Sequence, residues 1–213
     1  MATLSGLAIK ARDPDGLLGA KKDLGITCAL IPVDTPGVEI GHRHMPVGAA
    51  FMNGPTRGSD VFIPLDWIIG GEEYIGKGWS MLMECLADGR AISLPALGAA
   101  AGKMASHYTG SYARIRKQFR TPIGYFEGVE EVLAKIGGQS YAIEASRLLV
   151  LSALDSGEVP SVVSGIVKQQ TMERMREVVN NAMDIHGGHG ICMGPHNFLG
   201  RGYQLIPVGI TVE

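Results

Sequence analysis

Residues 184–190 read Asp-Ile-His-Gly-Gly-His-Gly and combine side chains that can bind a ligand with glycines that leave the backbone accessible. The apolar residues before them recur at steps of three and four, which predicts one buried helix face. These residues are Met175, Val178, Val179, Ala182 and Met183. Three glycines within four residues then end the helix, because glycine adopts positive φ and lets a ligand approach the backbone closely. We therefore expect a buried helix that delivers an open turn to a binding site.

The same turn has two simpler interpretations. A Gly-Gly pair after a helix is often only a C-terminal cap. His186, His189 and His196 could also be read as zinc ligands of a hydrolase. Structural and catalytic zinc sites combine histidine with cysteine or carboxylate at defined spacings, and this stretch has no such spacing. The zinc hypothesis is therefore weak, and no metal is expected.

Composition excludes several classes of protein. The chain has 213 residues, 46% of them hydrophobic, which is enough to form a sizeable core. A net charge of −2 gives no basic surface for nucleic acid. Cys28, Cys85 and Cys192 are odd in number and scattered, which favours reduced thiols over a disulfide framework. No run of residues resembles a signal peptide or a membrane span, so we expect a soluble, cytoplasmic protein.

The first part of the chain, residues 1–75, has the pattern of β-structure. Short apolar or alternating runs are bounded by Gly, Pro, Asp and Asn, which favour turns. The expected strands are 6–10, 25–31, 37–40 and 59–63. Strands this short predict an antiparallel barrel or sandwich, and four of them form only a partial one.

From residue 76 onward the pattern predicts long helices. The first has Leu97, Ala101, Met104, Tyr108, Tyr112 and Ile115 on its inner face, and Pro95 is expected to bend or restart it. The second follows Pro122 and ends near Gly157, with Val129, Leu133, Ile136, Ile143, Leu148 and Leu151 inside. The third begins at Pro160, with Ser161 as N-cap. Together they predict an antiparallel up-down bundle over residues 76–213 that lacks its last helix. The expected class is therefore α+β with two domains.

Five short motifs occur in order along this chain. They are 76–79 (Gly-Lys-Gly-Trp), Leu86 with 89–90 (Gly-Arg), 116–119 (Arg-Lys-Gln-Phe) with Pro122, 184–188, and 212–213 (Val-Glu). In this order and spacing they resemble the acyl-CoA dehydrogenases over essentially the whole chain, as the late middle β-domain and most of the C-terminal helical domain. Residues 37–41, 53–58 and 62–67 are most similar to the bacterial long-chain enzymes of fatty-acid β-oxidation.

The resemblance implies a reaction and its partners. Members of the family oxidise an acyl-CoA thioester to the trans-2-enoyl-CoA with FAD, and the electron-transfer flavoprotein reoxidises the flavin. Glu213 matches the family's catalytic base. A thioester α-proton is weakly acidic, so such a base needs a raised pKa in a desolvated site. The resemblance also implies a homodimer or homotetramer, and peripheral membrane association only for a full-length parent.

Six further residues occupy cofactor or substrate positions of the family. Arg116 resembles the arginine that reaches the FAD pyrophosphate across a dimer interface, and Phe119 the aromatic that packs on the cofactor. Gly187 and Gly188 resemble the turn that admits the adenosine portion of the partner subunit's FAD. Asp184 stands where many relatives have glutamine, just as Arg120 stands where they have glycine and Glu127 where glutamine is usual. Arg90 matches an arginine near the active-site end of the first helix.

Each of these assignments has an alternative. Arg116 could belong to an ordinary solvated helix end with Arg114, Lys117 and Arg120, and Arg90 could pair with Glu84 or Asp88. The chain could serve as an oligomerisation or scaffold module, or it could belong to an acyl-CoA oxidase that uses oxygen directly. Since much of the family's flavin site lies outside these residues, we expect this polypeptide alone to bind FAD weakly and turn over little substrate.

Overall fold

The computed structural model describes residues 3–49 and 52–212, apart from the side chain of Asp88. The chain forms two compact units, Met1–Cys85 and Leu86–Glu213. The first is built from short antiparallel strands and the second from helices, which confirms the expected α+β class. The boundary expected after residue 75 lies inside the first unit. Glu213, the expected base, lies outside the described residues.

Two separate sheets make up the strands of the first unit. Strands β1 (Leu4–Arg12) and β2 (Asp23–Pro32) pair antiparallel, as do β3 (Val38–Ile40) and β4 (Thr56–Gly58). They confirm three of the four expected strands and form no closed barrel within the described residues. The strand expected at 59–63 is wrong. Asp60 has a φ of 51°, which interrupts extended backbone, so β4 ends at Gly58.

The Gly-Lys-Gly-Trp motif owes its glycines to close packing on β2. A Cβ atom on Gly76 would lie 2.0 Å from the carbonyl oxygen of Leu24, and one on Gly78 would lie 2.9 Å from that of Ile26. The Gly76 N–H also donates to Thr27 Oγ1 at 2.9 Å. These glycines are therefore required by the approach of two backbones within the first unit, and the motif has a structural role.

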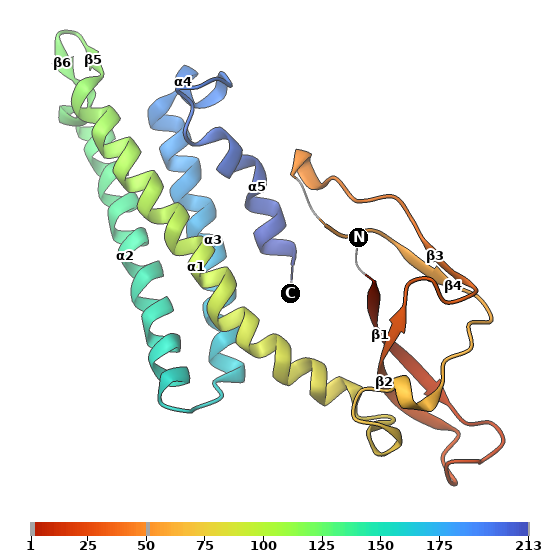
Figure 1. Ribbon diagram of the computed structural model, residues 1–213. Coiled ribbons are helices and arrows are strands. Elements are labelled where there is room, and N and C mark those ends of the chain that lie inside the picture. Colours follow the sequence, from red (N-terminus) through yellow and green to blue (C-terminus); the bar gives the residue numbers. More distant parts are fainter. Residues whose placement is uncertain (1–2, 50–51, 213) are drawn as a thin grey trace. The chain divides into compact units, whose positions relative to one another are not determined.

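Five helices form most of the rest of the chain. They are α1 (Gly78–Ile115), α2 (Glu127–Asp155), α3 (Ser161–His186), α4 (Gly188–Ile191) and α5 (Gly200–Thr211). In Figure 1, α1, α2 and α3 lie side by side with α5 along α3, which confirms the expected bundle. Within residues 3–49 and 52–212, no helix is long and apolar enough to cross a membrane. Short 3-10 turns occur at Pro46–Gly48, Leu65–Trp67, Glu72–Tyr74 and Ile123–Tyr125.

The helices differ from the expectation in three details. Helix α1 continues through Pro95 with a curved axis in Figure 1, so of the two alternatives expected there, a bend or a restart, only the restart is wrong. Ser161 is the first helical residue after Pro160 and makes no side-chain cap. Helix α5 was not expected, because its glycines and Pro207 resemble a loop in sequence. Packing against α3 supplies the stability that these residues do not.

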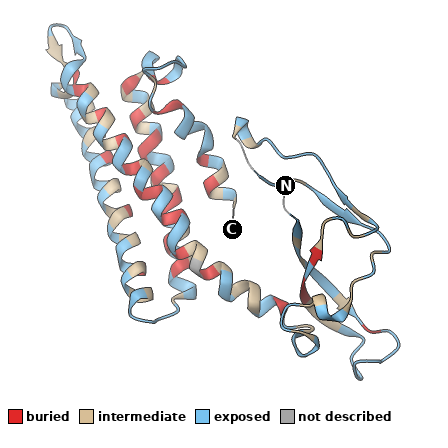
Figure 2. Ribbon diagram, viewed as in Figure 1, coloured by how far each residue is buried: buried red, intermediate tan, exposed pale blue. Residues whose placement is uncertain are grey.

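The stripe expected on α3 forms the centre of the helical core. Met175, Val178, Val179 and Ala182 are buried, and Met183 packs against them. On α2, Ile136 and Ile143 are buried as expected. The third buried residue of α2 is Val150, seven positions beyond Ile143, so the expectation for Leu148 is wrong and that side chain is exposed. Figure 2 shows the buried residues concentrated in α3 and along α1, with most of α2 exposed.

The inner face expected for α1 is correct only in part, because Ala101 and Tyr108 pack against the core and three other expected residues do not. Leu97, Met104 and Ile115 are exposed, whereas the buried positions are mostly small residues. We call these the small-residue stripe: Ala91, Gly98, Gly102, Ala105, Thr109 and Ala113. A Cβ on Gly98 would lie 3.0 Å from Met172 Cε, and one on Gly102 would lie 3.1 Å from Ser140 Oγ. The small residues therefore let α1 approach α2 and α3 closely.

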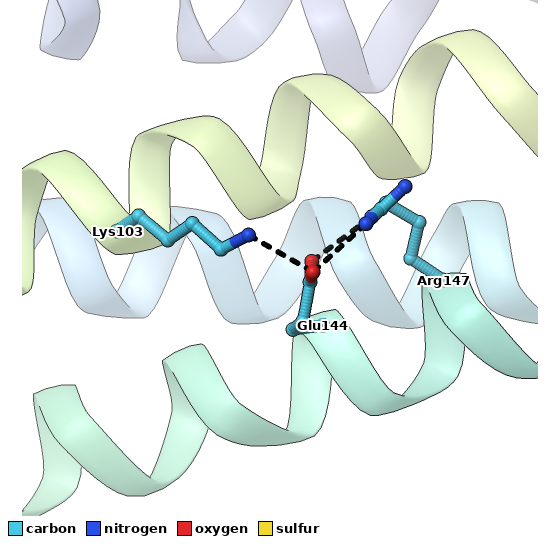
Figure 3. Close-up of polar contacts among 3 residues, drawn as sticks. All are labelled: Lys103, Glu144 and Arg147. Carbon is cyan, nitrogen blue, oxygen red and sulfur yellow. Dashed lines mark hydrogen bonds and ion pairs between the residues drawn. The ribbon is translucent and has the colours of Figure 1, made fainter.

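Polar contacts lie along the junction of α1 and α2. Ser140 Oγ donates to the carbonyl oxygen of Gly102 at 3.0 Å. Towards solvent, Glu144 accepts hydrogen bonds from Lys103 of α1 at 2.9 Å and from Arg147 of α2 at 2.8 and 2.9 Å, as Figure 3 shows. Donation from Arg147, and then from Lys103, lowers the pKa of Glu144 to about 2. The carboxylate thus stays charged over the physiological range and links the two helices.

Candidate functional site

A pocket of about 700 Å³ lies at the ends of α1 and α3. Tyr112 and Arg116 line it from the end of α1, and the segment from Ile185 to Asn197 forms much of the rest. The pocket brings together Arg116, Gly187 and Gly188, which are three of the five residues matched to the family's cofactor contacts. Arg116 precedes the two glycines by about 70 residues in the sequence, and only the packing of α1 beside α3 brings it close to them.

The turn at Gly187 has the open geometry expected from the sequence. Gly187 has a φ of 54°, and its N–H donates to the carbonyl oxygens of Met183 and Asp184, which caps α3. Helix α4 begins at the next residue. A Cβ on Gly190 would lie 3.0 Å from the Met183 carbonyl oxygen, so there is little space for a side chain where the chain turns back over α3. Capping and site formation are therefore properties of the same turn.

Asn197 holds the far side of the pocket in place. Its Nδ2 donates to the Gly190 carbonyl oxygen at 2.7 Å, and its Oδ1 accepts from the N–H of Leu199 and of Gly200 at 3.1 and 2.7 Å. One side chain thus ties α4 to the start of α5. Sequence reasoning missed this residue, although an asparagine shortly before a helix is a known start signal.

Two rings lie together in the wall of the pocket. His186 stacks on Tyr112 with ring centroids 4.3 Å apart and an interplanar angle of 15°. His186 is only 7% exposed, and its Nε2 finds no hydrogen-bond partner among the described residues. Burial, with a smaller contribution from the charge of His189, lowers the pKa of His186. The neutral imidazole is therefore the favoured form at neutral pH.

The histidines of this region do not gather into a metal site. Within the part of the chain that the structure describes, no three His, Cys, Asp or Glu side chains are arranged to hold a metal ion. His186 instead stacks on Tyr112, and His189 lies tilted to the same ring at 5.8 Å. Cys28, Cys85 and Cys192 are all free thiols. The geometry therefore gives the zinc hypothesis no support.

Arg116 and Phe119 lie on the short connection between α1 and α2. Strands β5 (Lys117–Gln118) and β6 (Thr121–Pro122) form a hairpin whose two turn residues, Phe119 and Arg120, have φ values of 50° and 68°. Arg116 is exposed and makes no ion pair with any described residue. Phe119 is 91% exposed and does not line the pocket. Arg116 thus contributes a cation to the pocket lining, whereas the Phe119 ring lies outside the pocket.

Asp184 and Arg90 lie apart from this pocket. Asp184 lines a second pocket of about 630 Å³ with Asn180, Tyr203 and Gln204, which shares Gly187 with the first. Arg90 is half-buried on α1. It precedes Arg116 by 26 residues, or roughly 40 Å of helix. The structure therefore does not bring Arg90 to the turn at Gly187.

Comparisons with known proteins find a family model and several relatives of this chain. The acyl-CoA dehydrogenase C-terminal domain matches residues 76–208. Among curated relatives, Protein HemX of Proteus mirabilis is 58% identical over 104 residues, covering 49% of this chain and 61% of that protein. Isobutyryl-CoA dehydrogenase, mitochondrial, of Dictyostelium discoideum is 29% identical over 180 residues, covering 81% of this chain and 41% of that protein.

Solved structures show the same fold. An acyl-CoA dehydrogenase from Geobacillus kaustophilus superposes with a TM-score of 0.85 at 24% identity, covering 99% of this chain and 53% of that one. Butyryl-CoA dehydrogenase from Megasphaera elsdenii superposes with a TM-score of 0.78 at 23% identity, covering 98% and 51%. The match thus covers between 41% and 61% of the length of these four relatives. From the match over residues 76–208, the chain belongs to the acyl-CoA dehydrogenase family.

Proposed function

We propose that this chain provides part of an FAD-dependent dehydrogenase that converts acyl-CoA thioesters of fatty-acid β-oxidation into trans-2-enoyl-CoA. The observation that carries the proposal is the single pocket that gathers Arg116, Gly187 and Gly188. These residues come from two segments that match the family's cofactor motifs. The family membership supports the type of reaction, and the pocket supports the location of the cofactor contact.

The residues of the pocket fit a dinucleotide cofactor. Arg116 is exposed and has no ion pair with a described residue, so its planar guanidinium is available to donate two hydrogen bonds to a pyrophosphate. Gly187 and Gly188 leave the backbone uncovered, because a Cβ on either residue would meet no atom closer than 4.0 Å. Bound FAD would accept the β-hydrogen of the substrate as hydride. In this proposal the chain's own residues bind and orient the adenosine and pyrophosphate portions.

The remaining roles follow from the family. Glu213 would remove the α-proton of the thioester, and Phe119, projecting from the hairpin, would pack on the cofactor of a partner subunit. Asp184 would face the cofactor from the neighbouring pocket, where an unpaired carboxylate would repel phosphate. A cytoplasmic homo-oligomer that passes electrons to the electron-transfer flavoprotein completes the proposal.

Visible absorption of the purified protein, after incubation with FAD and gel filtration, tests the cofactor site. We expect weak but saturable flavin binding, with the dissociation constant raised about tenfold in Arg116→Met through loss of charge-assisted hydrogen bonds. Arg114→Met is the matched control, because Arg114 is exposed on the same helix end and does not line the pocket. Equal binding by wild type and Arg116→Met would contradict the assignment. Enoyl-CoA formation at ordinary enzyme rates would contradict the expectation that this polypeptide alone turns over little substrate.

A further inference from the structure

Helix α5 depends on its neighbours for its structure. It has only 12 residues, which include three glycines and Pro207, and such a segment forms no stable helix by itself in water. Ile206 and Gly209 are its buried residues towards the C-terminal end. A Cβ on Gly209 would lie 3.3 Å from Met172 Sδ of α3. The end of α5 is therefore held by tertiary contacts.

Lys168 of α3 makes a polar contact with that end. Its side chain is half-buried, and its Nζ donates to the carbonyl oxygen of Ile210 at 3.1 Å. Ile210 lies in the last turn of α5, where carbonyl oxygens have no partner within the helix. A cation is also favourable at a helix C-terminus, because the helix dipole places partial negative charge there. Lys168 thus satisfies an acceptor and complements the dipole at the same point.

The residues that follow this contact lead to the proposed base. The Val212 N–H donates to the Val208 carbonyl oxygen at 3.0 Å, and Val212 then leaves the helix with extended backbone at a ψ of 144°. Both Ile210 and Val212 pack against the core cluster that includes Leu94, Ile143 and Met172. The last turn of α5 therefore helps to hold Val212, the residue that precedes Glu213 in the sequence.

We propose that Lys168 is a positioning residue that anchors the last turn of α5 and so orients the chain that carries Glu213. The anchor itself stands on the geometry of α3 and α5. Its consequence for catalysis rests on the proposed function, in which Glu213 is the base. A base must lie within hydrogen-bond reach of the proton it removes, so a loosened helix end would slow proton removal and leave thioester binding intact.

Amide hydrogen exchange of the 213-residue protein, measured by NMR, tests the anchor. Lys168→Met keeps the length of the side chain and removes its charge and donors, whereas Lys168→Arg keeps both. We expect exchange of the Val212 amide about tenfold faster in Lys168→Met and close to wild type in Lys168→Arg. Amides of Val178 and Ile143 should keep their rates. Lys135→Met is the control, because Lys135 is exposed and its ion pair is with Glu131 of its own helix.

Two results would overturn the proposal. One is a Val212 exchange rate within twofold of wild type in Lys168→Met, and the other is an equal acceleration throughout α3 and α5, which would indicate general destabilisation. With the FAD-loaded protein, Lys168→Met should lower the slow residual kcat about tenfold with KM for acyl-CoA within twofold, and Lys168→Arg should restore it. An unchanged kcat beside faster exchange would overturn the catalytic consequence alone. Absence of FAD binding by wild type bears on the proposed function, whereas the exchange rates still decide the anchor.

Discussion

Helices α3 and α1 pack in the same core with buried faces of opposite kinds. The buried face of α3 carries Met172, Met175, Val178 and Val179, whose large side chains fill the space between helices. The buried face of α1 is the small-residue stripe, which brings its backbone close to its neighbours. Large apolar residues of α1 such as Leu97 and Met104 remain exposed. The difference teaches that a helix face can be buried because its side chains are small as well as because they are large and apolar.

Both helices end at the same pocket, so the comparison bears on function. Arg116 follows α1 directly, and Gly187 follows α3 directly. The Tyr112 and His186 rings stack across the two helix ends at 4.3 Å, which requires α1 to lie close to α3. The small-residue stripe of α1 therefore positions Arg116. The buried apolar residues of α3, which we call the apolar stripe, position Gly187.

The largest expected effect tests the apolar stripe. Met172→Ala should lower the free energy of unfolding by about 3 kcal/mol, because it removes a fully buried side chain from between α3, α1 and α5. Urea denaturation followed by circular dichroism measures the change. Met104→Ala on α1 is the control and should change stability by less than about 0.5 kcal/mol, since Met104 is exposed. Similar losses for both variants would break the comparison.

The next effect tests the small-residue stripe. Gly102→Val should cost about 2 kcal/mol, because its Cβ would already lie 3.1 Å from Ser140 Oγ and the γ-methyl groups need further space. Gly137→Ala on α2 is the control, with open space around the new Cβ, and should gain about 0.5–1 kcal/mol from helix propensity. The same denaturation experiment applies. A Gly102→Val protein as stable as wild type would show that close approach of α1 is not required.

Glu144 sharpens the comparison at the solvent side of the α1–α2 junction. Its folded-state pKa is lowered from 4.5 to about 2, so the stabilisation is present above pH 4.5 and is lost as pH falls from about 4.5 to about 2. We expect Glu144→Gln to lose about 1 kcal/mol at pH 7, a value reduced by the exposure of Lys103. The difference in stability between Glu144→Gln and wild type should shrink from pH 7 to pH 4 and again to pH 2.5. A constant difference at all three values would contradict the ion-pair account.

The smallest effect concerns the hairpin that joins α1 to α2. Arg120 has a φ of 68°, a conformation that glycine adopts without the steric cost of a Cβ. Arg120→Gly should therefore raise the free energy of unfolding by about 0.5–1 kcal/mol. Arg114→Gly, inside the last turn of α1, should lower it by a similar amount. A loss of stability in Arg120→Gly would mean that the Arg120 side chain stabilises the hairpin.

Much of the fold could be predicted from local patterns in the sequence. The predictions that failed share a physical cause. Helices α2 and α3 were predicted because large apolar residues recur with helical spacing. The inner face of α1 was assigned wrongly at Leu97, Met104 and Ile115, because alanine and glycine carry little periodic signal although they decide how closely helices approach. Helix α5 was missed because Pro207 and its glycines oppose helix formation locally, and tertiary contacts with α3 outweigh them.

The sequence by itself determined the α+β class, the two long helices α2 and α3, and the residues around Gly187 and Arg116 that match the family, because these features depend on local propensity and on short motifs. Only the tertiary structure decided that Arg116, Gly187 and Gly188 share one pocket, that Tyr112 stacks on His186 and that Asn197 braces the loop. It also placed Asp184 in a neighbouring pocket and Lys168 at the end of α5. These relations join residues far apart in sequence, and they exist because small side chains let α1 pack closely beside α3.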